Sequence, residues 1–278
     1  MRVDFNENYF ENIDTEDKAY WLGFLYADGY VRIGKRNSGQ LKLKLSQKDK
    51  DHILKFKNCI ESKKDIKDSK DVFFSNGKEY ISLSSTFNVY SFKMVNDLIS
   101  HGCVNNKTQK IRFPNLNNNL IYHFIRGYFD GDGCIFKNKN RPNSFTISIC
   151  SNKIFVEELS SFLEIGKIIN YKNYSLLTFN KIDDIKNFRD LIYKNCNICL
   201  ERKKIIFDKI KNVYNKDYSY TKTFRKNYSI IDPNGNEHFV NHLKEFCLNN
   251  SLIYSTMSNL SRGIGKSNKG WTCKKIIN

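Results

Sequence analysis

Two aspartates in similar surroundings are the residues of this sequence best suited to do chemistry. Asp28 follows the apolar stretch "WLGFLYA" and Asp132 follows "IRGYFDG", so the acids lie 104 residues apart (132 minus 28). Each is expected in the last turn of a helix, where the negative end of the helix dipole opposes a carboxylate. Two such carboxylates brought together need a cation, and Mg²⁺ binds carboxylate oxygen while it retains several waters.

Small residues precede both acids at helical spacing. Gly23 and Ala27 lie four residues apart in the first stretch, and Gly127 and Gly131 do so in the second. Residues at i and i+4 share one face of a helix, and a glycine inside a helix costs roughly 0.5–1 kcal/mol relative to alanine. Close packing of the two helices would compensate for that cost. The sequence therefore predicts that the helices touch along their small residues and that both acids emerge at the same end.

The stretch around each acid opens a repeated series of elements. Each series continues with alternating apolar and polar residues, a helical stretch, a second alternating stretch and a second helical stretch. In the first half these are residues 41–47, 50–60, 79–85 and 89–100. In the second half they are residues 144–150, 153–163, 174–180 and 184–193. We therefore expect an α+β protein in which residues 1–105 and 106–210 are two copies of one unit.

The charge of the chain favours a nucleic acid as its partner. Basic residues number 46 and acidic residues 29, a net charge of +17. Codon bias of an AT-rich genome accounts for some of the lysines. The segment from Glu201 to Asn278 nevertheless carries fifteen basic and six acidic side chains, a net +9. Such a concentration is typical of nucleic-acid binding, and no amphipathic segment has the strongly basic face of a membrane-surface helix.

Neither a membrane segment nor a secretion signal is evident in the sequence. No run of eighteen apolar residues is present, and the N-terminal residues lack the apolar core of a signal peptide. The eight cysteines are expected to be reduced thiols rather than a disulfide framework. We therefore expect a protein of the cytoplasm, or of an organellar matrix, that is not secreted and has no membrane partner.

Paired acids, a repeated α/β unit and a basic surface together fit metal-assisted phosphodiester hydrolysis. Bound divalent metals would activate a water molecule and stabilise the leaving oxygen. The duplication supplies a reason for the second acid, because a DNA duplex has two strands to cut.

The two stretches resemble the paired signature motifs of the LAGLIDADG homing endonucleases. The resemblance rests on "WLGFLYADG" and "IRGYFDGDG", extends over about residues 18–210 and is to the single-chain members. It implies a pseudo-twofold tandem αββαββα repeat whose motif helices form the central interface and whose curved sheets form a saddle on the DNA major groove. It also implies a monomer that cuts both strands of a long site with Mg²⁺, for which Mn²⁺ substitutes.

By motif position, the resemblance assigns metal binding to two carboxylates and to the carbonyl oxygens that precede them. These residues are Asp28, Asp132, Ala27 and Gly131. The motifs differ where the first has Tyr26 and the second has Asp130. That position faces away from the metals in the family pattern, so the difference is compatible with catalysis.

The resemblance also implies residues that assist the acids. Gln47 follows the second strand, where the family often has a polar residue that orders active-site water. Its internal counterpart is Ser151, a departure from the pattern. Lys107 and Lys203 occupy equivalent positions in the two halves and are the candidates for basic residues near the scissile phosphates.

Two expected hairpins carry side chains suited to DNA binding. In the first half they are Arg32, Lys35, Arg36, Gln40, Lys42 and Lys44. In the second half they are Lys137, Lys139, Arg141 and Asn143. Such side chains bind base edges or phosphates. A solvated hairpin tip accounts for any one of them equally well, but not for the whole set.

The C-terminal quarter has a different character. Residues 211–227 are basic and aperiodic and are expected to form a linker. Residues 228–278 contain an Asp-Pro-Asn-Gly turn and two short helices with a shared core of Leu243, Phe246, Cys247, Leu252, Met257 and Leu260. This segment resembles the helix-turn-helix modules behind phage and intron endonucleases, and a small capping subdomain is the alternative.

The second resemblance implies particular DNA contacts in the C-terminal module. The second helix would enter a major groove, and the residues following it would contact phosphate. The residues facing bases would be Tyr254, Ser255, Ser258 and Asn259. Those contacting phosphate would be Arg262, Lys266 and Lys269.

Two functions other than DNA cleavage stay open at this point. The fold also occurs in maturases that bind intron RNA, and a protein of this fold can bind DNA without cutting it. The presence of both acids disfavours the second alternative. The leading prediction is a site-specific double-strand DNA endonuclease that serves the homing of an intron or a mobile gene.

Overall fold

The two acids end two helices that pack against each other, α1 (Glu16–Asp28) and α5 (Asn118–Asp132). The side chain of Thr15 caps the first turn of α1, and Asn117 does the same for α5. A glycine in extended conformation follows each helix and begins a strand. The computed structural model describes residues 4–105, 110–137, 144–215, 227–240 and 243–276.

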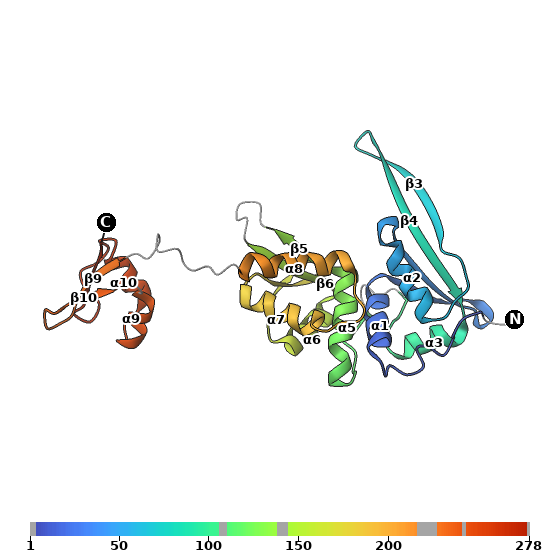
Figure 1. Cartoon of the computed structure of the whole chain (residues 1–278), viewed down its shortest axis with the longest axis horizontal. Coiled ribbons are helices and arrows are strands. Elements are labelled where there is room, and N and C mark those ends of the chain that lie inside the picture. The colour runs from blue at the N-terminus through green and yellow to red at the C-terminus, as the bar shows by residue number, and fades with distance from the viewer. Residues whose placement is uncertain (1–3, 106–109, 138–143, 216–226, 241–242, 277–278) are drawn as a thin grey trace. The chain divides into compact units, whose positions relative to one another are not determined.

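The chain separates into two compact units, Met1–Val213 and Tyr214–Asn278. The larger unit contains both halves of the repeat (Figure 1). Its first half continues after α1 with β1 (Gly29–Ile33), η1 (Lys35–Asn37), β2 (Gly39–Ser46), η2 (Gln47–Asp49), α2 (Lys50–Cys59), β3 (Lys67–Ser75), β4 (Lys78–Tyr90) and α3 (Phe92–Ser100). Its second half continues after α5 with β5 (Gly133–Lys137), β6 (Phe145–Ser151), α6 (Lys153–Leu163), β7 (Lys167–Asn170), β8 (Ser175–Phe179) and α7 (Ile182–Tyr193). Helix α8 (Glu201–Asn215) follows.

The two halves have the same topology. Each contains a four-stranded antiparallel sheet, of order β1-β2-β4-β3 in the first half and β5-β6-β8-β7 in the second. The first residue after each acid pairs with a buried residue of the next strand, Gly29 with Leu43 and Gly133 with Ile149. The predicted tandem repeat of an α+β unit is therefore confirmed.

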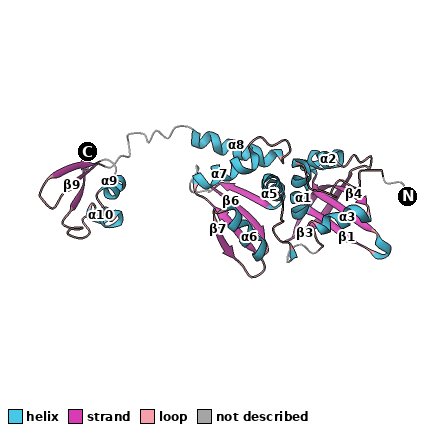
Figure 2. Cartoon of the chain, turned by 90° about the horizontal axis from the view of Figure 1, so that it is seen from below, coloured by secondary structure: helices cyan, strands magenta, loops and turns pink. Residues whose placement is uncertain are grey.

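One face of each sheet is buried under helices and the other is open to solvent. In the first sheet the buried side chains are Val31, Leu41, Leu43, Phe87 and Val89. Figure 2 shows the helices of each half on one side of its sheet. Because side chains alternate along a strand, the residues between these lie on the open face.

Several elements differ from the expectation drawn from the sequence. Strand β4 runs to Tyr90, so the first two residues of the helix predicted over 89–100 belong to the strand. Strands β3 and β7 were not predicted, because β3 is exposed at every position and β7 has only four residues. Helix α8 was not predicted either, and its last five residues occupy the start of the segment expected to be a linker.

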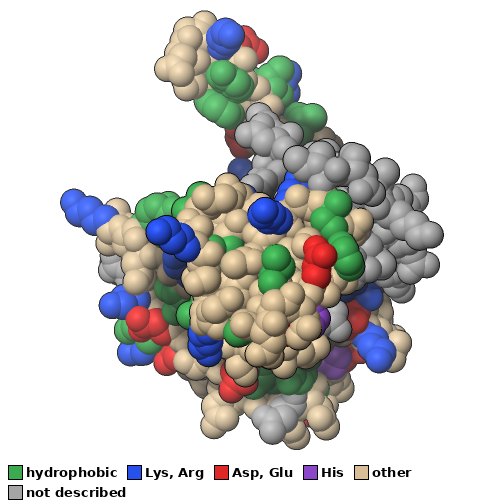
Figure 3. Space-filling model, turned by 90° about the vertical axis from the view of Figure 1, so that its left-hand side faces the viewer, with side chains coloured by type: hydrophobic (Ala, Val, Ile, Leu, Met, Phe, Trp, Pro, Cys, Tyr) green, Lys and Arg blue, Asp and Glu red, His purple; other side chains and the backbone are tan. Residues whose placement is uncertain are grey.

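Strands β3 and β4 form an arm that extends beyond the helices of the first half (Figure 1). All nine residues of β3 and the first six of β4 are exposed. Hydrophobic side chains lie on the arm beside acidic and basic ones, as its tip at the top of Figure 3 shows. The most exposed is Phe74, at 73%.

The smaller unit is built on a three-stranded sheet. The sheet contains β9 (Asn227–Ile231), β10 (Glu237–Val240) and β11 (Thr272–Ile276), which pair in the order β10-β9-β11. Along the chain, helices α9 (Leu243–Asn249) and α10 (Tyr254–Leu260) lie between β10 and β11. The predicted turn is present at Asp232–Gly235, where Gly235 has φ +90. The predicted core is confirmed, although Phe246 is only partly buried, and it also includes Ile230 and Cys273.

The part of the chain that the structure describes contains no helix of the length and apolarity required to cross a bilayer.

Candidate functional site

Helices α1 and α5 approach so closely that only glycine fits at two positions of their interface. A Cβ atom on Gly23 would lie 2.0 Å from the carbonyl oxygen of Phe124, and one on Gly127 would lie 1.9 Å from that of Tyr20. These neighbours are backbone atoms that cannot move aside alone. The prediction of close packing through small residues is therefore confirmed, and the glycines are required by contact between the helices rather than by a turn.

The same packing brings both acids to one end of the helix pair. Asp28 and Asp132 are the last residues of α1 and α5, and both are exposed. A Cβ atom on Gly131 would lie 2.3 Å from Cβ of Ala27 and 3.2 Å from Oδ2 of Asp28. The carboxylate of Asp28 thus lies against the residue that precedes Asp132.

Both carboxylates also act on the same neighbours. Burial is the main cause of the raised pKa of Tyr128, and the negative charges of Asp132 and Asp28 raise this pKa further. The same two charges raise the pKa of Lys203 against the opposing effect of its burial. Asp28 and Asp132 therefore both lie within electrostatic range of Tyr128 and Lys203.

The donor set around the acids suits a hard cation that retains water. Among the described residues no cluster of three or more His, Cys, Asp and Glu side chains forms a metal site. Two exposed carboxylates are therefore the strongest charged donors at this end of the helices, and Mg²⁺ commonly binds through one or two carboxylates with waters completing its octahedron. The carbonyl oxygen of Gly131 already accepts a hydrogen bond from Nζ of Lys203 at 3.1 Å.

A cavity of about 170 Å³ lies beside Asp132. Ser151, Asn152, Tyr128 and Tyr174 line it with polar groups, and it has room for about five waters at roughly 30 Å³ each. Oγ of Ser151 is buried next to Tyr128 without a well-formed hydrogen bond. The position equivalent to Gln47 thus borders a space suited to ordered water.

Gln47 itself begins η2, directly after β2, and is exposed. Ser151 is the last residue of β6, two residues beyond the partner of Gly133, whereas Gln47 lies four residues beyond the partner of Gly29. Nearby, hydrogen bonds from Lys50 at 2.7 Å and from Ser85 at 2.6 Å lower the pKa of Asp68 on β3.

Lys203 lies in the first turn of α8 and is only 5% exposed. Its Nζ donates to the carbonyl oxygens of Phe129 at 2.6 Å, Gly131 at 3.1 Å and Gly133 at 2.6 Å. Burial lowers the pKa of Lys203 to about 8. A cation bound to the last carbonyls of α5 stabilises the end of that helix, so Lys203 lies beneath the acids rather than on an open surface. Its predicted counterpart, Lys107, lies outside the described residues.

The candidate DNA-binding residues of the first half lie mainly on the open face of the sheet. Arg32 pairs with Gln40, and Lys42 pairs with Asn88, across from the buried leucines. Lys44 forms an ion pair with Asp71 of the arm at 3.1 Å. Lys35 and Arg36 lie in the exposed η1 turn at the hairpin tip.

In the second half the structure describes only one of the four candidates. Lys137 is exposed at the end of β5. Lys139, Arg141 and Asn143 lie outside the described residues.

The open face of the first sheet continues into a basic hollow that the sequence prediction missed. The hollow has a volume of about 410 Å³ and is lined by Lys63, Lys64, Asp65, Lys67, Thr86, Asn88 and Tyr90. Nζ of Lys64 lies 5.4 Å from the ring centroid of Tyr90. The Lys-Lys pair after α2 and the alternation of Thr86, Asn88 and Tyr90 along β4 are the signals that could have revealed it.

In the smaller unit the predicted base-facing residues are only partly available. Tyr254 is exposed at the start of α10, whereas Ser258 and Asn259 are half-buried. The guanidinium of Arg262 donates to the side-chain oxygen of Asn259 and to the backbone carbonyl oxygen of Ser258. The side chain of Ser255 lies outside the described part of the chain. Two further predicted phosphate contacts, Lys266 and Lys269, are exposed, and Nζ of Lys269 donates to the carbonyl oxygen of Ser251.

Comparison with known proteins adds a family match and several structural matches. Residues 119–205, most of the second half, match the family model of the LAGLIDADG-like domain. No curated protein matches the chain. The homing endonuclease I-WcaI bound to its DNA recognition sequence is 17% identical, with a TM-score of 0.51 over 71% of this chain and 90% of its own. That likeness shows the fold.

Two further structures resemble the chain less closely. The I-LtrWI LAGLIDADG homing endonuclease bound to target DNA is 16% identical, with a TM-score of 0.46 over 77% of this chain and 93% of its own. The LAGLIDADG meganuclease I-AabMI bound to uncleaved DNA is 13% identical, with a TM-score of 0.48 over 73% of this chain and 91% of its own.

Proposed function

We propose that the chain is a double-strand DNA endonuclease of the LAGLIDADG type, in which Asp28 and Asp132 hold Mg²⁺. The observation that carries the proposal is the pair of closely packed motif helices, one from each half, that end in adjacent aspartates. The family match over residues 119–205 and the fold shared with I-WcaI support it. Mn²⁺ is expected to substitute, because it also accepts carboxylate and water ligands.

In this proposal each acid serves one strand of the duplex. The metal, when bound, lowers the pKa of a water molecule and stabilises the leaving oxygen. Asp28 and Asp132 bind and orient it, with the carbonyl oxygens of Ala27 and Gly131 as further candidate ligands. Gln47 in the first half and Ser151 in the second are the groups proposed to order the attacking water.

The lysines have separate roles in the proposed mechanism. Lys203 holds the carbonyl end of α5 and places positive charge beneath Asp132. We assign Lys107 to the scissile phosphate of the first half from its sequence position alone.

The open faces of the two sheets are proposed to bind the major groove of a long DNA site. The net charge of +17 favours association with the phosphate backbone. The side chains on the open face of the first sheet, Arg32, Gln40, Lys42 and Lys44, are suited to base and phosphate contacts. Because both motifs belong to one chain, the protein is proposed to act as a monomer in the homing of an intron or mobile gene.

The smaller unit is proposed to add a second DNA contact through α10 and the basic segment that follows it. Deletion of residues 228–278 is expected to weaken DNA binding and to reduce the slope of log K against log salt concentration. The slope falls because a protein that makes fewer phosphate contacts releases fewer counterions when it binds. An unchanged slope would make the unit a structural cap.

Selection of cleaved sites from a random duplex library with Mg²⁺ tests the central proposal. With the wild-type protein we expect the cleaved duplexes to share one asymmetric consensus sequence and to be cut on both strands. With the Asp132→Asn protein we expect no such cleaved duplexes. Enrichment of bound but uncut DNA would instead identify a DNA-binding protein that does not cleave. Binding to structured RNA in preference to every duplex would identify a maturase.

A further inference from the structure

Two pairs of residues at equivalent positions of the repeat meet across the interface between the halves, and one pair is polar whereas the other is aromatic. Under the 104-residue offset Tyr20 corresponds to Phe124, and Tyr26 corresponds to Asp130. On one side of the interface Oη of Tyr20 donates to Oδ2 of Asp130 at 2.7 Å. On the other side the rings of Tyr26 and Phe124 meet edge to face at 4.9 Å. The two sites are therefore supported by different chemistry.

Asp130 is a fully buried carboxylate with three donors. It is 0% exposed and accepts hydrogen bonds from Tyr20, from the hydroxyl of Tyr193 and from the backbone N–H of Leu200 at 2.7 Å. Burial raises the pKa of Asp130 above its ordinary value, and these three hydrogen bonds only partly oppose that rise. Burying a carboxylate is expensive unless hydrogen bonds satisfy it, and here they come from both halves of the repeat.

Leu200 immediately precedes α8, so the bond from Asp130 fixes the start of that helix. A carboxylate at a helix N-terminus is favourable. One turn further on, Lys203 donates to three carbonyls at the end of α5. The end of α5 and the start of α8 are thus joined twice, by the Asp130 side chain of α5 on the N-terminus of α8 and by the Lys203 side chain of α8 on the C-terminus of α5.

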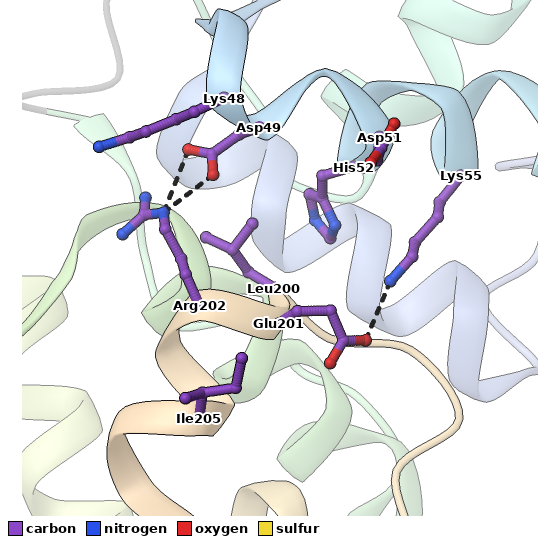
Figure 4. Close-up of a pocket in the computed structure, with 9 residues that line it drawn as sticks. All are labelled: Lys48, Asp49, Asp51, His52, Lys55, Leu200, Glu201, Arg202 and Ile205. Atoms are coloured by element: carbon purple, nitrogen blue, oxygen red, sulfur yellow. Dashed lines mark hydrogen bonds and ion pairs between the residues drawn. The ribbon is translucent and has the colours of Figure 1, made fainter.

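The first turn of α8 is also tied to the first half. Arg202 forms an ion pair with Asp49 at 3.0 Å, and Lys55 forms one with Glu201 at 3.2 Å. Figure 4 shows these pairs on either side of His52, in a pocket of about 420 Å³. The Lys55–Glu201 pair is largely exposed and therefore weak. The Arg202–Asp49 pair is better shielded, because the Asp49 side chain is only 9% exposed. The start of α8 is thus held by the buried bonds of Asp130 and Lys203 and, from the first half, by Asp49.

We infer that Asp130 is a positioning residue for Asp132: it fixes the start of α8 so that Lys203 remains on the carbonyls of the turn that carries the catalytic acid. The inference rests on the proposed nuclease function. In the first half the equivalent Tyr26 makes one neutral bond, from its Oη to the carbonyl oxygen of His101 at 2.6 Å. Loss of the Asp130 carboxyl group and its hydrogen bonds will consequently slow the cut that depends on Asp132 more than the other cut.

The test is Asp130→Asn in the full-length protein, with a target duplex labelled on each strand in turn. Single-turnover cleavage is measured at saturating protein, together with DNA binding. We expect one strand to be cut about tenfold to a hundredfold more slowly, the other to change less than about threefold, a nicked intermediate to accumulate, and the Kd to stay within about twofold. Equal slowing of both strands, or a weaker Kd that explains the loss, overturns the inference.

Two further variants separate positioning from a general loss of stability. Asp190→Asn removes a half-exposed carboxylate from α7 and is expected to leave the ratio of strand rates unchanged. Because Asp130 is inferred to act through Lys203, adding Asp130→Asn to Lys203→Met should slow that strand no further. Independent, additive losses in the double variant contradict the inference.

Amide hydrogen exchange without DNA distinguishes failure of the inference from failure of the proposed function. The Asp130→Asn protein should exchange the amides of Leu200 to Lys204 at least about tenfold faster than the wild type, with no such change in α1. If no DNA is cut but this local exchange is seen, the junction is real and the nuclease proposal is wrong. If DNA is cut but exchange and strand ratio are unaltered, Asp130 has no positioning role.

Discussion

The first and second halves of the larger unit share an element order and a strand order, but they differ in what surrounds the common motif. The acids, the glycines of the helix interface and the glycine that begins each following strand are present in both. The side chains beneath them differ, as Tyr26 and Asp130 do, and so do the hairpins, since β3 has nine residues and β7 has four. The residues that the backbone contact between the helices requires are thus common to the two halves, whereas the side chains beneath the acids and the lengths of the hairpins differ.

The largest expected effect tests whether the two acids are equivalent. Asp28→Asn and Asp132→Asn each remove one carboxylate from the shared site and should lower double-strand cleavage by about a thousandfold. Binding should persist, because removal of negative charge does not weaken attraction to phosphate. Strand-specific cleavage and a binding assay are the measurements. If nicked DNA accumulates with only one of the two variants, the two acids contribute unequally to cleavage. If either variant cuts both strands as fast as the wild type, the assignment of the catalytic acids is refuted.

The interface glycines should be equally indispensable in the two halves. Gly23→Ala and Gly127→Ala place a Cβ atom 2.0 and 1.9 Å from backbone oxygens of the partner helix. Such overpacking typically costs about 1–3 kcal/mol, and it should separate the acids and reduce cleavage. Urea unfolding measures the change in stability.

Gly34→Ala is the matched control for the interface glycines. A Cβ atom there would meet Oγ of Ser38 at 2.5 Å, a side chain that can rotate away. Its stability should change by less than about 0.5 kcal/mol. A comparably small loss in Gly127→Ala would mean that the helices are less tightly packed than the structure shows.

The two halves should also differ in their response to acid. Burial, with Lys55 and Arg202 nearby, lowers the pKa of His52 to about 3, whereas the equivalent position of α6 is Phe155. Tyr20 donates its hydroxyl proton to Asp130, so Nε2 of neutral His52 must donate to Oη of Tyr20, at 2.9 Å. Below pH about 6.5 the unfolded chain binds a proton that the folded chain does not. The free energy of unfolding should therefore fall with decreasing pH by up to about 1.4 kcal/mol per unit.

His52→Phe, which copies the second half, should flatten this dependence. Between pH 6.5 and 5 the wild type should lose about 2 kcal/mol relative to the variant. Unfolding free energies at pH 7, 6 and 5 measure the difference. Parallel curves for the two proteins would show that His52 is protonated in the folded state.

The structural features that depend on residues close together in the sequence could be predicted from the sequence alone. The glycine faces follow from four-residue spacing, and the buried strands β2 and β6 follow from period-two alternation, so both were predicted. Strand β3 has no buried face and therefore no period-two signal. Its pairing with β4 is visible only in the folded chain.

The support of the site could not be predicted, because it joins residues that are distant in sequence. Asp130 meets Tyr193 and Leu200, which lie 63 and 70 residues away. The sequence indicated that its position faces away from the metals, but it could not indicate these partners. Lys203 was expected near a phosphate, and nothing in "LERKK" shows that one lysine of that segment is buried beneath three carbonyls.

The arm distinguishes the described parts of the two halves, since β3 and β4 are much longer than β7 and β8, and its expected effect on function is the smallest. Phe73 pairs with Tyr80 on the face that also carries Asp71, the partner of Lys44, whereas Phe74 lies on the opposite face. Replacing residues 72–81 with Asn-Gly keeps the pairing of Asp71 with Ser82 and closes a two-residue hairpin. Four residues are lost from each strand of the arm, 72–75 of β3 and 78–81 of β4, a reach of roughly 13 Å at about 3.3 Å per residue.

If the open face binds DNA, the shortened arm should reduce the footprint by about four base pairs, at roughly 3.4 Å each, on the side of the first half alone. Cleavage should continue, and the Kd should rise by about tenfold at most. Phe73→Ala should reproduce part of the loss and Phe74→Ala should not, because the two rings lie on opposite faces of the arm. A footprint that shortens on both sides, or a stronger effect of Phe74→Ala, would mean that the other face of the arm meets the DNA and that the two halves do not use equivalent surfaces.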